Sequence, residues 1–379
     1  MNDADIKTLF NNFLETSLDV KEGQNLWLHT RGYGAESTIE IVKDVLASKG
    51  VKTHFFDNSD AAVREVMAVA DQSGNRKGYL ETMGDRNLRK MKEMDAFLAI
   101  GGVRPSNVIA PPVEDLNDFH SLVVEKASMY RVKQLPWLVA TAPTEHFARA
   151  CGMTGKDFDG YYLNACMAVT PTMEDRVEPL YDLLLNGKNV QIKGKDTDIE
   201  FSIDGIGAKK CIGYRNRPDG ECYTAPVKDS VNGEILYTKS TYAGTDFPWI
   251  KLSCEQGRIV SAESDGDALT VKLNDILNQD DGARYFGEFA IAFNPIVDVP
   301  VGNILFDEKI KGSFHLTPGT CYTDFADNGN TSVVHWDMVQ IQRSDHGGGT
   351  IVIDDELIRK DGLFVPKRLR GLNPENLVL

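Results

Sequence analysis

The sequence predicts an α/β N-terminal domain with a mostly parallel sheet, followed by an α+β C-terminal domain with a mostly antiparallel sheet. The chain has 379 residues, and chains beyond roughly 250–300 residues usually divide into domains. Helical and strand patterns alternate in the first half, which implies parallel strands joined by crossover helices. After Gly187 the pattern changes to short alternating runs between turn residues, which is typical of antiparallel sheet.

The elements of the first half follow from the spacing of apolar residues and from the glycines that end them. Apolar residues recur at helical spacing over residues 6–14. Gly50 ends a helix at 37–49, and Gly187 ends a helix at 171–186. The other predicted elements are strands at 25–29, 51–56, 96–101 and 137–141, and a helix at 61–70. We therefore expect two domains, residues 1–187 and residues 188–379.

In the second half, short runs with two-residue periodicity indicate strands between turn residues. The predicted strands are residues 190–193, 199–203, 233–240, 250–253, 258–262, 289–293, 332–341 and 350–354. One amphipathic stretch, residues 268–279, predicts a helix among them. This mixture is the reason for assigning the C-terminal domain to the α+β class.

The charge balance argues against two classes of binding partner, nucleic acids and membrane surfaces. Lysine and arginine total 41 and aspartate and glutamate total 56, giving a net charge of −15. Such a surface repels phosphate backbones and anionic lipids, so we expect neither nucleic-acid nor membrane binding. The apolar stretch Phe97–Val103 is far shorter than the roughly 18 residues of a spanning helix. The start, MNDADIK, has no apolar signal core, so we expect a cytoplasmic protein.

Cysteine and glycine patterns argue against two common kinds of site. The six cysteines include no CxxC pair, so a thiolate zinc site is not expected and any metal would be held by oxygen and imidazole. The Gly-Tyr-Gly turn at Gly32–Gly34 lacks the third glycine of a dinucleotide motif, which favours a tight strand-to-helix turn. The four histidines of the first domain share no ligand spacing and are interpreted as structural or solvent-facing: His29, His54, His120 and His146.

The segment Ser332–Ile341 places an imidazole and a carboxylate on one face. If the segment is a strand, Val334, Trp336 and Met338 share one face, and His335 and Asp337 share the other. Such a pair is a natural chelate for a divalent cation. The alternative is a His–Asp hydrogen bond on a solvated sheet face, and the pattern alone does not decide between them.

Glu288 lies in an almost wholly apolar run, residues 285–295. A carboxylate buried there without a partner would cost several kcal/mol or become protonated. A bound cation would satisfy it, and so would a buried arginine or lysine.

Four further residues carry a weaker signal when taken singly. Glu308 precedes His315 by seven residues, and Tyr322 follows His315 by seven. Spacing alone favours a solvated glutamate, a structural histidine and a packed tyrosine. Glu221 follows a Pro-Asp-Gly turn and alone would pass as a surface carboxylate.

Four segments in order nevertheless form a recognisable set. They are GECYTAP (220–226), GEFAIAFNP (287–295), FDEK…H…PG…Y (306–322) and HWD (335–337). Together they resemble the thermophilic metalloaminopeptidase family of the aminopeptidase T and aminopeptidase S type. The resemblance implies a dinuclear metalloprotease that removes N-terminal residues from peptides with a free N-terminus, acting as a homodimer in the cytoplasm. The first domain would then supply a wall of the site and the dimer contacts.

The resemblance also implies roles for individual residues. Glu308 would contact the metals as a ligand or act as the general base, and Tyr322 would donate a hydrogen bond to the oxyanion. The four carboxylates among the implied ligands carry −4, which two divalent ions (Zn, Co, Mn or Mg) would balance. The implied metal ligands are Glu221, Glu288, Glu308, His315, His335 and Asp337.

Two other functions remain open at this level. His315, His335 and Asp337 alone could hold a mononuclear non-haem Fe(II) site of a ring-cleaving dioxygenase. Glu221 and Glu288 discriminate, because a single iron site has no need of further buried carboxylates. A non-catalytic protein that binds a small ligand in its first domain is the third interpretation, and only the α/β pattern supports it.

Overall fold

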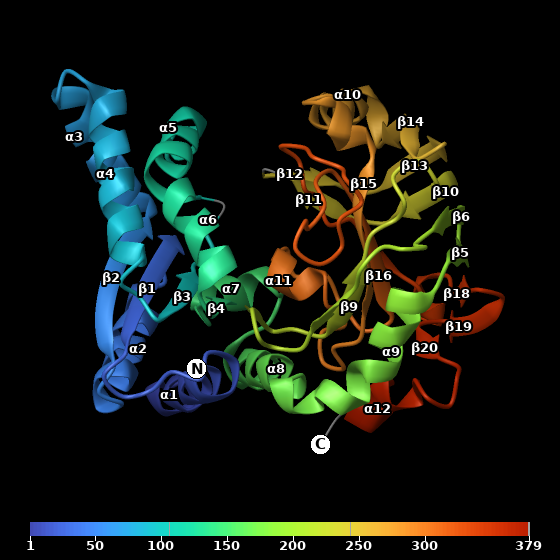
Figure 1. Ribbon diagram of the computed structural model, residues 1–379, viewed down its shortest axis with the longest axis horizontal. Helices are drawn as coiled ribbons and strands as arrows, with labels where there is room; N and C mark the ends of the chain where they lie inside the picture. The colour runs from blue at the N-terminus through green and yellow to red at the C-terminus, as the bar shows by residue number, and fades with distance from the viewer. Residues whose placement is uncertain (106, 243, 378–379) are drawn as a thin grey trace. The chain divides into compact units, whose positions relative to one another are not determined.

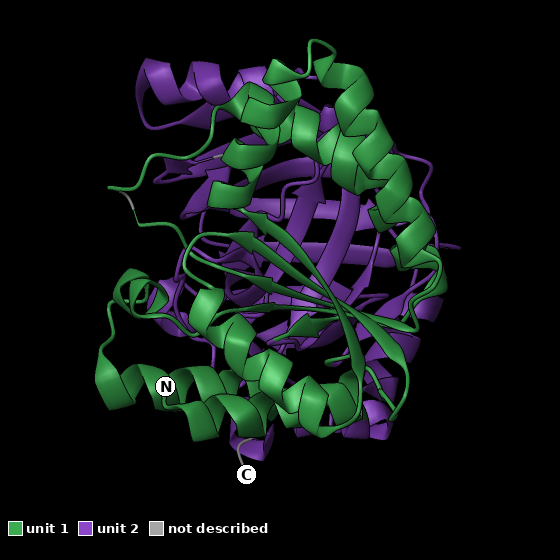
Figure 2. Ribbon diagram, turned by 90° about the vertical axis from the view of Figure 1, so that its left-hand side faces the viewer, with its two compact units in different colours: residues 1–171, 213–217 green, residues 172–212, 218–379 purple. Residues whose placement is uncertain are grey.

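The computed structural model describes residues 1–105, 107–242 and 244–377 and divides into two compact units (Figure 2). Unit 1 comprises residues 1–171 and 213–217, and unit 2 comprises residues 172–212 and 218–379. The predicted boundary at residue 187 therefore falls inside unit 2, since the helix Glu174–Asn186 belongs to that unit. The predicted classes, parallel α/β followed by antiparallel α+β, are confirmed.

Unit 1 is built on a five-stranded sheet in which every neighbouring pair is parallel. Trp27 and Phe97 point to one face and pack in a cluster with helical residues such as Leu80. Leu26 and Leu98 point to the other face and are fully buried as well, as a parallel sheet with two covered faces requires. In spatial order the strands are β2 (Lys52–Ser59), β1 (Asn25–Gly32), β3 (Ala96–Gly101), β4 (Trp137–Thr141) and β8 (Asn216–Arg217) (Figure 1).

The helices of unit 1 precede, join and follow these parallel strands, and five of them (α4, α5, α6, α7 and α8) were not predicted from the sequence. Gly32 and Gly34 have φ values of +76° and +81°, so the turn after β1 needs glycine for its backbone conformation. The helices are α1 (Asp3–Asn12), α2 (Glu36–Ser48), α3 (Asp60–Gln72), α4 (Arg76–Met91), α5 (Val113–Asp118), α6 (Glu125–Gln134), α7 (Glu145–Ala150) and α8 (Gly155–Ala168).

Arg217 ends the short segment through which the chain returns to unit 1. Its guanidinium is fully buried and donates to the hydroxyls of Thr16 and Ser17 at 2.8 and 2.9 Å and to the carbonyl of Cys166 at 2.9 Å. These bonds fix strand β8 at the edge of the unit 1 sheet. Pro218 then begins the stretch of unit 2 that carries Asp219 and Glu221.

Unit 2 contains two larger antiparallel sheets and one small hairpin. The first sheet has the order β14 (Arg258–Ser264), β13 (Ile250–Glu255), β10 (Asn232–Tyr237), β6 (Thr197–Ser202), β5 (Asn189–Gly194), β18 (Gly349–Ile353), β19 (Glu356–Lys360) and β20 (Leu363–Phe364). The second has the order β17 (Val339–Ile341), β16 (Ser313–Pro318), β15 (Phe286–Ala292), β9 (Glu221–Thr224) and β7 (Lys209–Cys211). The hairpin is β11 (Ser240–Tyr242) and β12 (Thr245–Phe247), and the helices are α9 (Glu174–Asn186), α10 (Gly266–Leu277), α11 (Ile304–Asp307) and α12 (Pro374–Leu377).

The two larger sheets of unit 2 contact each other through aromatic and polar side chains. The rings of Phe201 on β6 and Phe289 on β15 meet edge to face with centroids 5.0 Å apart. The hydroxyl of Tyr237 on β10 donates to the carbonyl of Leu316 on β16 at 3.0 Å. These contacts hold the five-stranded sheet of unit 2 rigidly. The face of that sheet turned away from the eight-stranded sheet is available to carry a site.

The predicted strands of the second half are mostly confirmed, with one error of extent and several omissions. The segment 332–341 is regular strand only at β17, although its burial alternates as expected, with Val334 and Met338 buried and His335 and Asp337 partly exposed. Strands β9 and β16, which carry two candidate site residues, were not predicted. Among the described residues, no helix has the length and apolar character needed to cross a membrane.

Candidate metal centre

Strand pairing brings three of the predicted metal ligands to one face of the five-stranded sheet of unit 2. Ala292 on β15 lies opposite Glu221 on β9, and Ala290 lies opposite His315 on β16. Residues two apart on a strand share a face, so Glu288 on β15 projects from the same side as both. All three are buried, with Glu221 4%, Glu288 3% and His315 1% exposed. The sequence separates these residues widely, and the sheet places them side by side.

His335 and Asp337 reach the same place from the extended segment before β17. Thr317, opposite Glu288 in the sheet, donates to Asp337 Oδ1 at 2.9 Å. Between the two residues, Trp336 turns away and donates from its indole nitrogen to the hydroxyl of Ser240 at 2.8 Å. The buried indole therefore anchors the segment, so that the flanking imidazole and carboxylate face the sheet.

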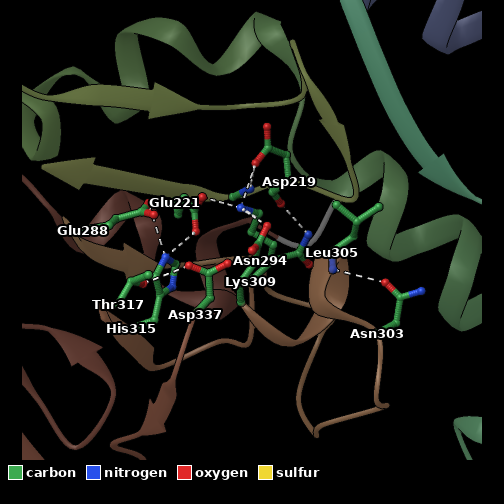
Figure 3. A network of polar contacts seen from close by, with 12 residues as sticks. Asp219, Glu221, Glu288, Asn294, Asn303, Leu305, Lys309, His315, Thr317 and Asp337 are labelled. Atoms are coloured by element: carbon green, nitrogen blue, oxygen red, sulfur yellow. Dashed lines mark hydrogen bonds and ion pairs between the residues drawn. The ribbon is translucent and has the colours of Figure 1, made fainter. Parts of the chain in front are cut away.

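Two overlapping groups of ligand atoms result, and they share Glu288. In the first, His315 Nε2 lies 3.5 Å from Glu288 Oε1 and 3.8 Å from Glu221 Oε2. In the second, His335 Nε2 lies 3.3 Å from Glu288 Oε2 and 3.2 Å from Asp337 Oδ1. Each oxygen of Glu288 thus faces a different histidine (Figure 3 shows the contacts of the first group). A carboxylate with this arrangement can serve two cations at once.

The donor atoms fit divalent cations. Glu221 Oε2 is buried without a hydrogen-bond partner among the described residues, which is costly unless another group satisfies it. His335 Nδ1 lies 2.9 Å from the carbonyl of Thr320 and must donate to it. The neutral His335 ring therefore presents its Nε2 lone pair to the site, as metal-binding histidines commonly do. Oxygen and imidazole without thiolate suit Zn²⁺, Co²⁺, Mn²⁺ or Mg²⁺.

Protons on the imidazoles balance the carboxylates when no cation is bound. Burial lowers the pKa of His315, but Glu221 and Glu288 outweigh it and raise that pKa to about 9. His335 likewise has its pKa raised well above the usual range, since Asp337 and Glu288 outweigh burial. Burial of Asp337 acts to raise its pKa, yet His335 and His315 lower it overall. The site thus holds positive charge even before a metal ion arrives.

Glu308 lies at the end of α11 and belongs to neither group among the described residues. It is buried rather than solvated, and its Oε1 lies 2.8 Å from the ammonium of Lys309. Burial, opposed by Lys309 and supported by Glu221, raises the pKa of Glu308 to about 8. The structure therefore brings Glu308 close to the ligands and pairs it with a lysine.

Lys309 and Asp219 were not identified from the sequence. Lys309 is fully buried and its ammonium contacts Glu221, Glu308 and Asp219. Burial lowers the pKa of Lys309, but the carboxylates outweigh it and raise that pKa well above its usual range. The signals available were weak: a lysine next to Glu308 in a stretch of alternating charged and apolar residues, and an aspartate inside a predicted turn.

Tyr322 stands at the open edge of the site. Its hydroxyl lies 3.3 Å from His335 Nε2, and the two ring centroids are 5.0 Å apart. The residue is 45% exposed, and burial of its hydroxyl raises the pKa of the phenol well above the usual range. A pocket of about 280 Å³ adjoins Asp337, with side walls of Pro300, Ile304, Val339 and Ile341 and the polar residues Lys239 and Asp307. Tyr322 therefore borders the site, whereas its spacing alone had favoured a tyrosine packed in the core.

The histidines of unit 1 behave as structural groups. His29 packs between the rings of Phe56 and Phe97, and burial lowers its pKa to about 3. His54 packs against the ring of Trp27. None of the four histidines of this unit belongs to a metal-binding group in the described part of the chain.

Comparison with known families identifies the kind of protein. The model of the thermophilic metalloprotease family (M29) matches residues 3–364. The chain belongs to this family. The resemblance seen in the four sequence segments is thereby confirmed, and a family of metalloproteases implies a divalent metal cofactor.

Two curated proteins with related sequences are named as aminopeptidases. Aminopeptidase AmpS of Bacillus subtilis (strain 168) is 29% identical over 166 residues, which cover 40% of this chain and 38% of the relative. Aminopeptidase 2 of Geobacillus stearothermophilus is 31% identical over 194 residues, which cover 44% of this chain and 46% of the relative. The aligned segments thus span less than half the length of either relative.

Two solved structures share the fold of this M29 chain. Wild-type AmpT from Thermus thermophilus superposes with a TM-score of 0.78 at 19% identity, covering 96% of this chain and 99% of the other. A 2,5-dihydroxypyridine dioxygenase from Pseudomonas putida KT2440 superposes with a TM-score of 0.62 at 15% identity, covering 98% and 100%. At these identities the likeness concerns the fold alone.

Metal binding to this M29 chain should release protons near neutral pH. At pH 7.5 the metal-free His315 is protonated because its pKa is raised to about 9, and a coordinated imidazole must be neutral. Calorimetric titration with Co²⁺ in two buffers of different ionisation enthalpy should show release of at least about one proton. Affinity should rise as the pH increases toward 9.

The same titration of a His54→Gln variant should give the wild-type proton count, because His54 belongs to unit 1 and to neither ligand group. His315→Gln should lower the count. A binding enthalpy at pH 7.5 that does not depend on the buffer would contradict the assignment of His315 as a ligand.

Proposed function

We propose that the protein is a metal-dependent aminopeptidase that holds two divalent ions. The observation that carries this proposal is the pair of ligand groups joined by Glu288, with one histidine facing each of its oxygens. Glu221 and His315 complete the first group, and His335 and Asp337 complete the second. Membership of a metalloprotease family and the names of the two curated relatives support hydrolysis of peptide bonds as the reaction.

Residues around the two groups would supply acid–base chemistry and charge stabilisation. When bound, two divalent ions acidify a water molecule and polarise the scissile carbonyl. Glu308 is close to the ligands but outside both groups, which favours the general-base role over ligation. Its carboxylate would take the water's proton and pass it to the leaving amine. Tyr322, exposed beside His335, would donate a hydrogen bond to the oxyanion that develops on the carbonyl.

The proposed substrates are peptides with a free N-terminus. An α-ammonium group needs a carboxylate or lone-pair partner, and the centre is rich in carboxylates. The pocket beside Asp337 would receive part of the peptide, because it opens from the ligand group itself. The identity of the ions (Zn, Co, Mn or Mg), the homodimeric state and the cytoplasmic location stay predictions from the family resemblance.

A mononuclear Fe(II) dioxygenase is the weaker alternative. His315, His335 and Asp337 are near one another, and the fold of a ring-cleaving dioxygenase is similar. However, Glu221 and Glu288 are buried on the same sheet face and contact His315. A single iron held by two histidines and one carboxylate would leave these carboxylates without a cation.

Peptidase assays with matched blocked and unblocked substrates test the proposed function. The protein loaded with Co²⁺, Mn²⁺ or Zn²⁺ should release amino acids from a tripeptide with a free N-terminus. Acetylation of that N-terminus should lower kcat/KM at least about 100-fold, because it removes the charged group that the site recognises. Treatment with a chelator followed by dialysis should abolish activity, and returning the divalent ion should restore it.

Equal rates on the free and the acetylated tripeptide would contradict an aminopeptidase even if chelation abolished activity. Oxygen consumption in the presence of a dihydroxypyridine, with one iron per chain and no release of amino acids, would support the alternative instead.

Substitution of Glu308 tests the base assignment. Glu308→Gln keeps the size of the side chain but removes the proton acceptor, so kcat should fall by about 10²–10⁴ with both ions retained. Glu356→Gln, which removes a partly exposed carboxylate on β19 that pairs with Arg368, should leave kcat unchanged. Kinetics and metal analysis of the same samples make the comparison. Wild-type kcat in Glu308→Gln would exclude Glu308 as the base, and loss of one ion would identify it as a ligand.

A further inference from the structure

Lys309 is the one lysine of the described chain whose side chain is fully buried. Its ammonium contacts Glu221 Oε1 and lies 3.6 Å from Asp219 Oδ1 (Figure 3). The ammonium also lies 2.8 Å from Glu308 Oε1. A buried ammonium is stable only when carboxylates surround it. The close contacts show that Lys309 is part of the charge distribution of the site.

The ammonium occupies a position that could otherwise take a metal ion. Besides the two groups joined by Glu288, the described residues contain a third group that could hold a metal: Cys211, Asp219 and Glu221. Both carboxylates of this third group contact the ammonium of Lys309. The protein thus provides its own cation at this position.

The two carboxylate oxygens of Glu221 face different groups, one toward Lys309 and the other toward the candidate metal centre. Its Oε1 accepts from the Lys309 ammonium. Its Oε2 has no hydrogen-bond partner among the described residues and lies 3.8 Å from His315 Nε2. A divalent ion in the first group would therefore meet one oxygen of Glu221, since the other is already engaged.

The charges of the buried groups agree with this division. With all five carboxylates ionised, Asp219, Glu221, Glu288, Glu308 and Asp337 would together carry −5, and Lys309 carries +1, which leaves −4. Two divalent ions bring +4 once the histidines are neutral. Without Lys309 the same carboxylates would keep one negative charge after two ions had bound, and such a buried surplus is unfavourable.

We propose that Lys309 is a positioning residue that fills a third cation position and limits the centre to two divalent ions. It holds Glu221 so that only Oε2 faces the first ligand group. This inference deepens the proposed two-ion function and rests on the same site. A third ion beside Glu221 would compete for the carboxylate that the first group requires, and the lysine prevents that competition.

The test is the number of ions bound by matched variants, measured by equilibrium dialysis against saturating Co²⁺ with metal analysis. Lys309→Met removes the charge and keeps an apolar side chain of comparable length, so it should bind one equivalent of Co²⁺ more than the wild type. Lys309→Arg keeps the charge and should bind the wild-type number. Lys311→Met is the matched control two residues away. Lys311 pairs with Asp298 instead of the site, and its replacement should not change the number.

A double variant, Asp219→Asn with Lys309→Met, removes the surplus carboxylate together with the lysine and should return to the wild-type number. If Lys309→Met alone does not fold, this variant still tests the charge balance, because the −4 charge is restored. A packing role alone cannot add a binding site, so an extra equivalent is specific to the proposal.

The proposal is overturned if Lys309→Met folds and binds no more Co²⁺ than the wild type. It is also overturned if the double variant binds fewer ions than the wild type. Failure of the proposed two-ion function is recognised separately, as a single equivalent in the wild type. The inference about Lys309 is judged by the difference between variant and wild type, whatever the wild-type number.

Discussion

Buried negative charge in unit 2 is the constraint on which the rest of the site depends. Carboxylates at positions 219, 221, 288, 308 and 337 are largely removed from solvent and close to one another. Burial of each without a cation costs several kcal/mol. The chain meets this requirement with Lys309 and with protonated histidines, and divalent ions can replace the protons. The rigid sheet keeps the ligands together despite their mutual repulsion.

The sequence predicted the layers of the fold better than its connections. Alternation of helix and strand identified the parallel sheet of unit 1, because buried parallel strands are continuous apolar runs. The predicted boundary at residue 187 follows the helix Glu174–Asn186, which belongs to unit 2, so this helix was assigned to the first domain. The return of residues 213–217 to the first sheet depends on Arg217, whose partners lie far away in the sequence. Local patterns carry no information about such contacts.

For the site, local sequence identified pairs, and only strand register could assemble them. His335 and Asp337 were recognisable as a pair from alternation, and Glu288 from its apolar surroundings. Strands β9 and β16 are short and wholly buried, so they lack the alternation that marks a half-exposed strand. Lys309 was missed because a lysine is normally solvated, and its burial follows from carboxylates that approach in three dimensions.

Diffraction from crystals grown with Co²⁺, collected at the cobalt absorption edge, would locate the bound ions. A two-ion centre should give two anomalous peaks per chain, one beside Glu221 and His315 and one beside His335 and Asp337, with an oxygen of Glu288 near each. Ligand atoms should lie at coordination distances of roughly 2.0–2.2 Å. A single peak held by the two histidines and Asp337, with Glu221 and Glu288 outside coordination distance, would contradict it.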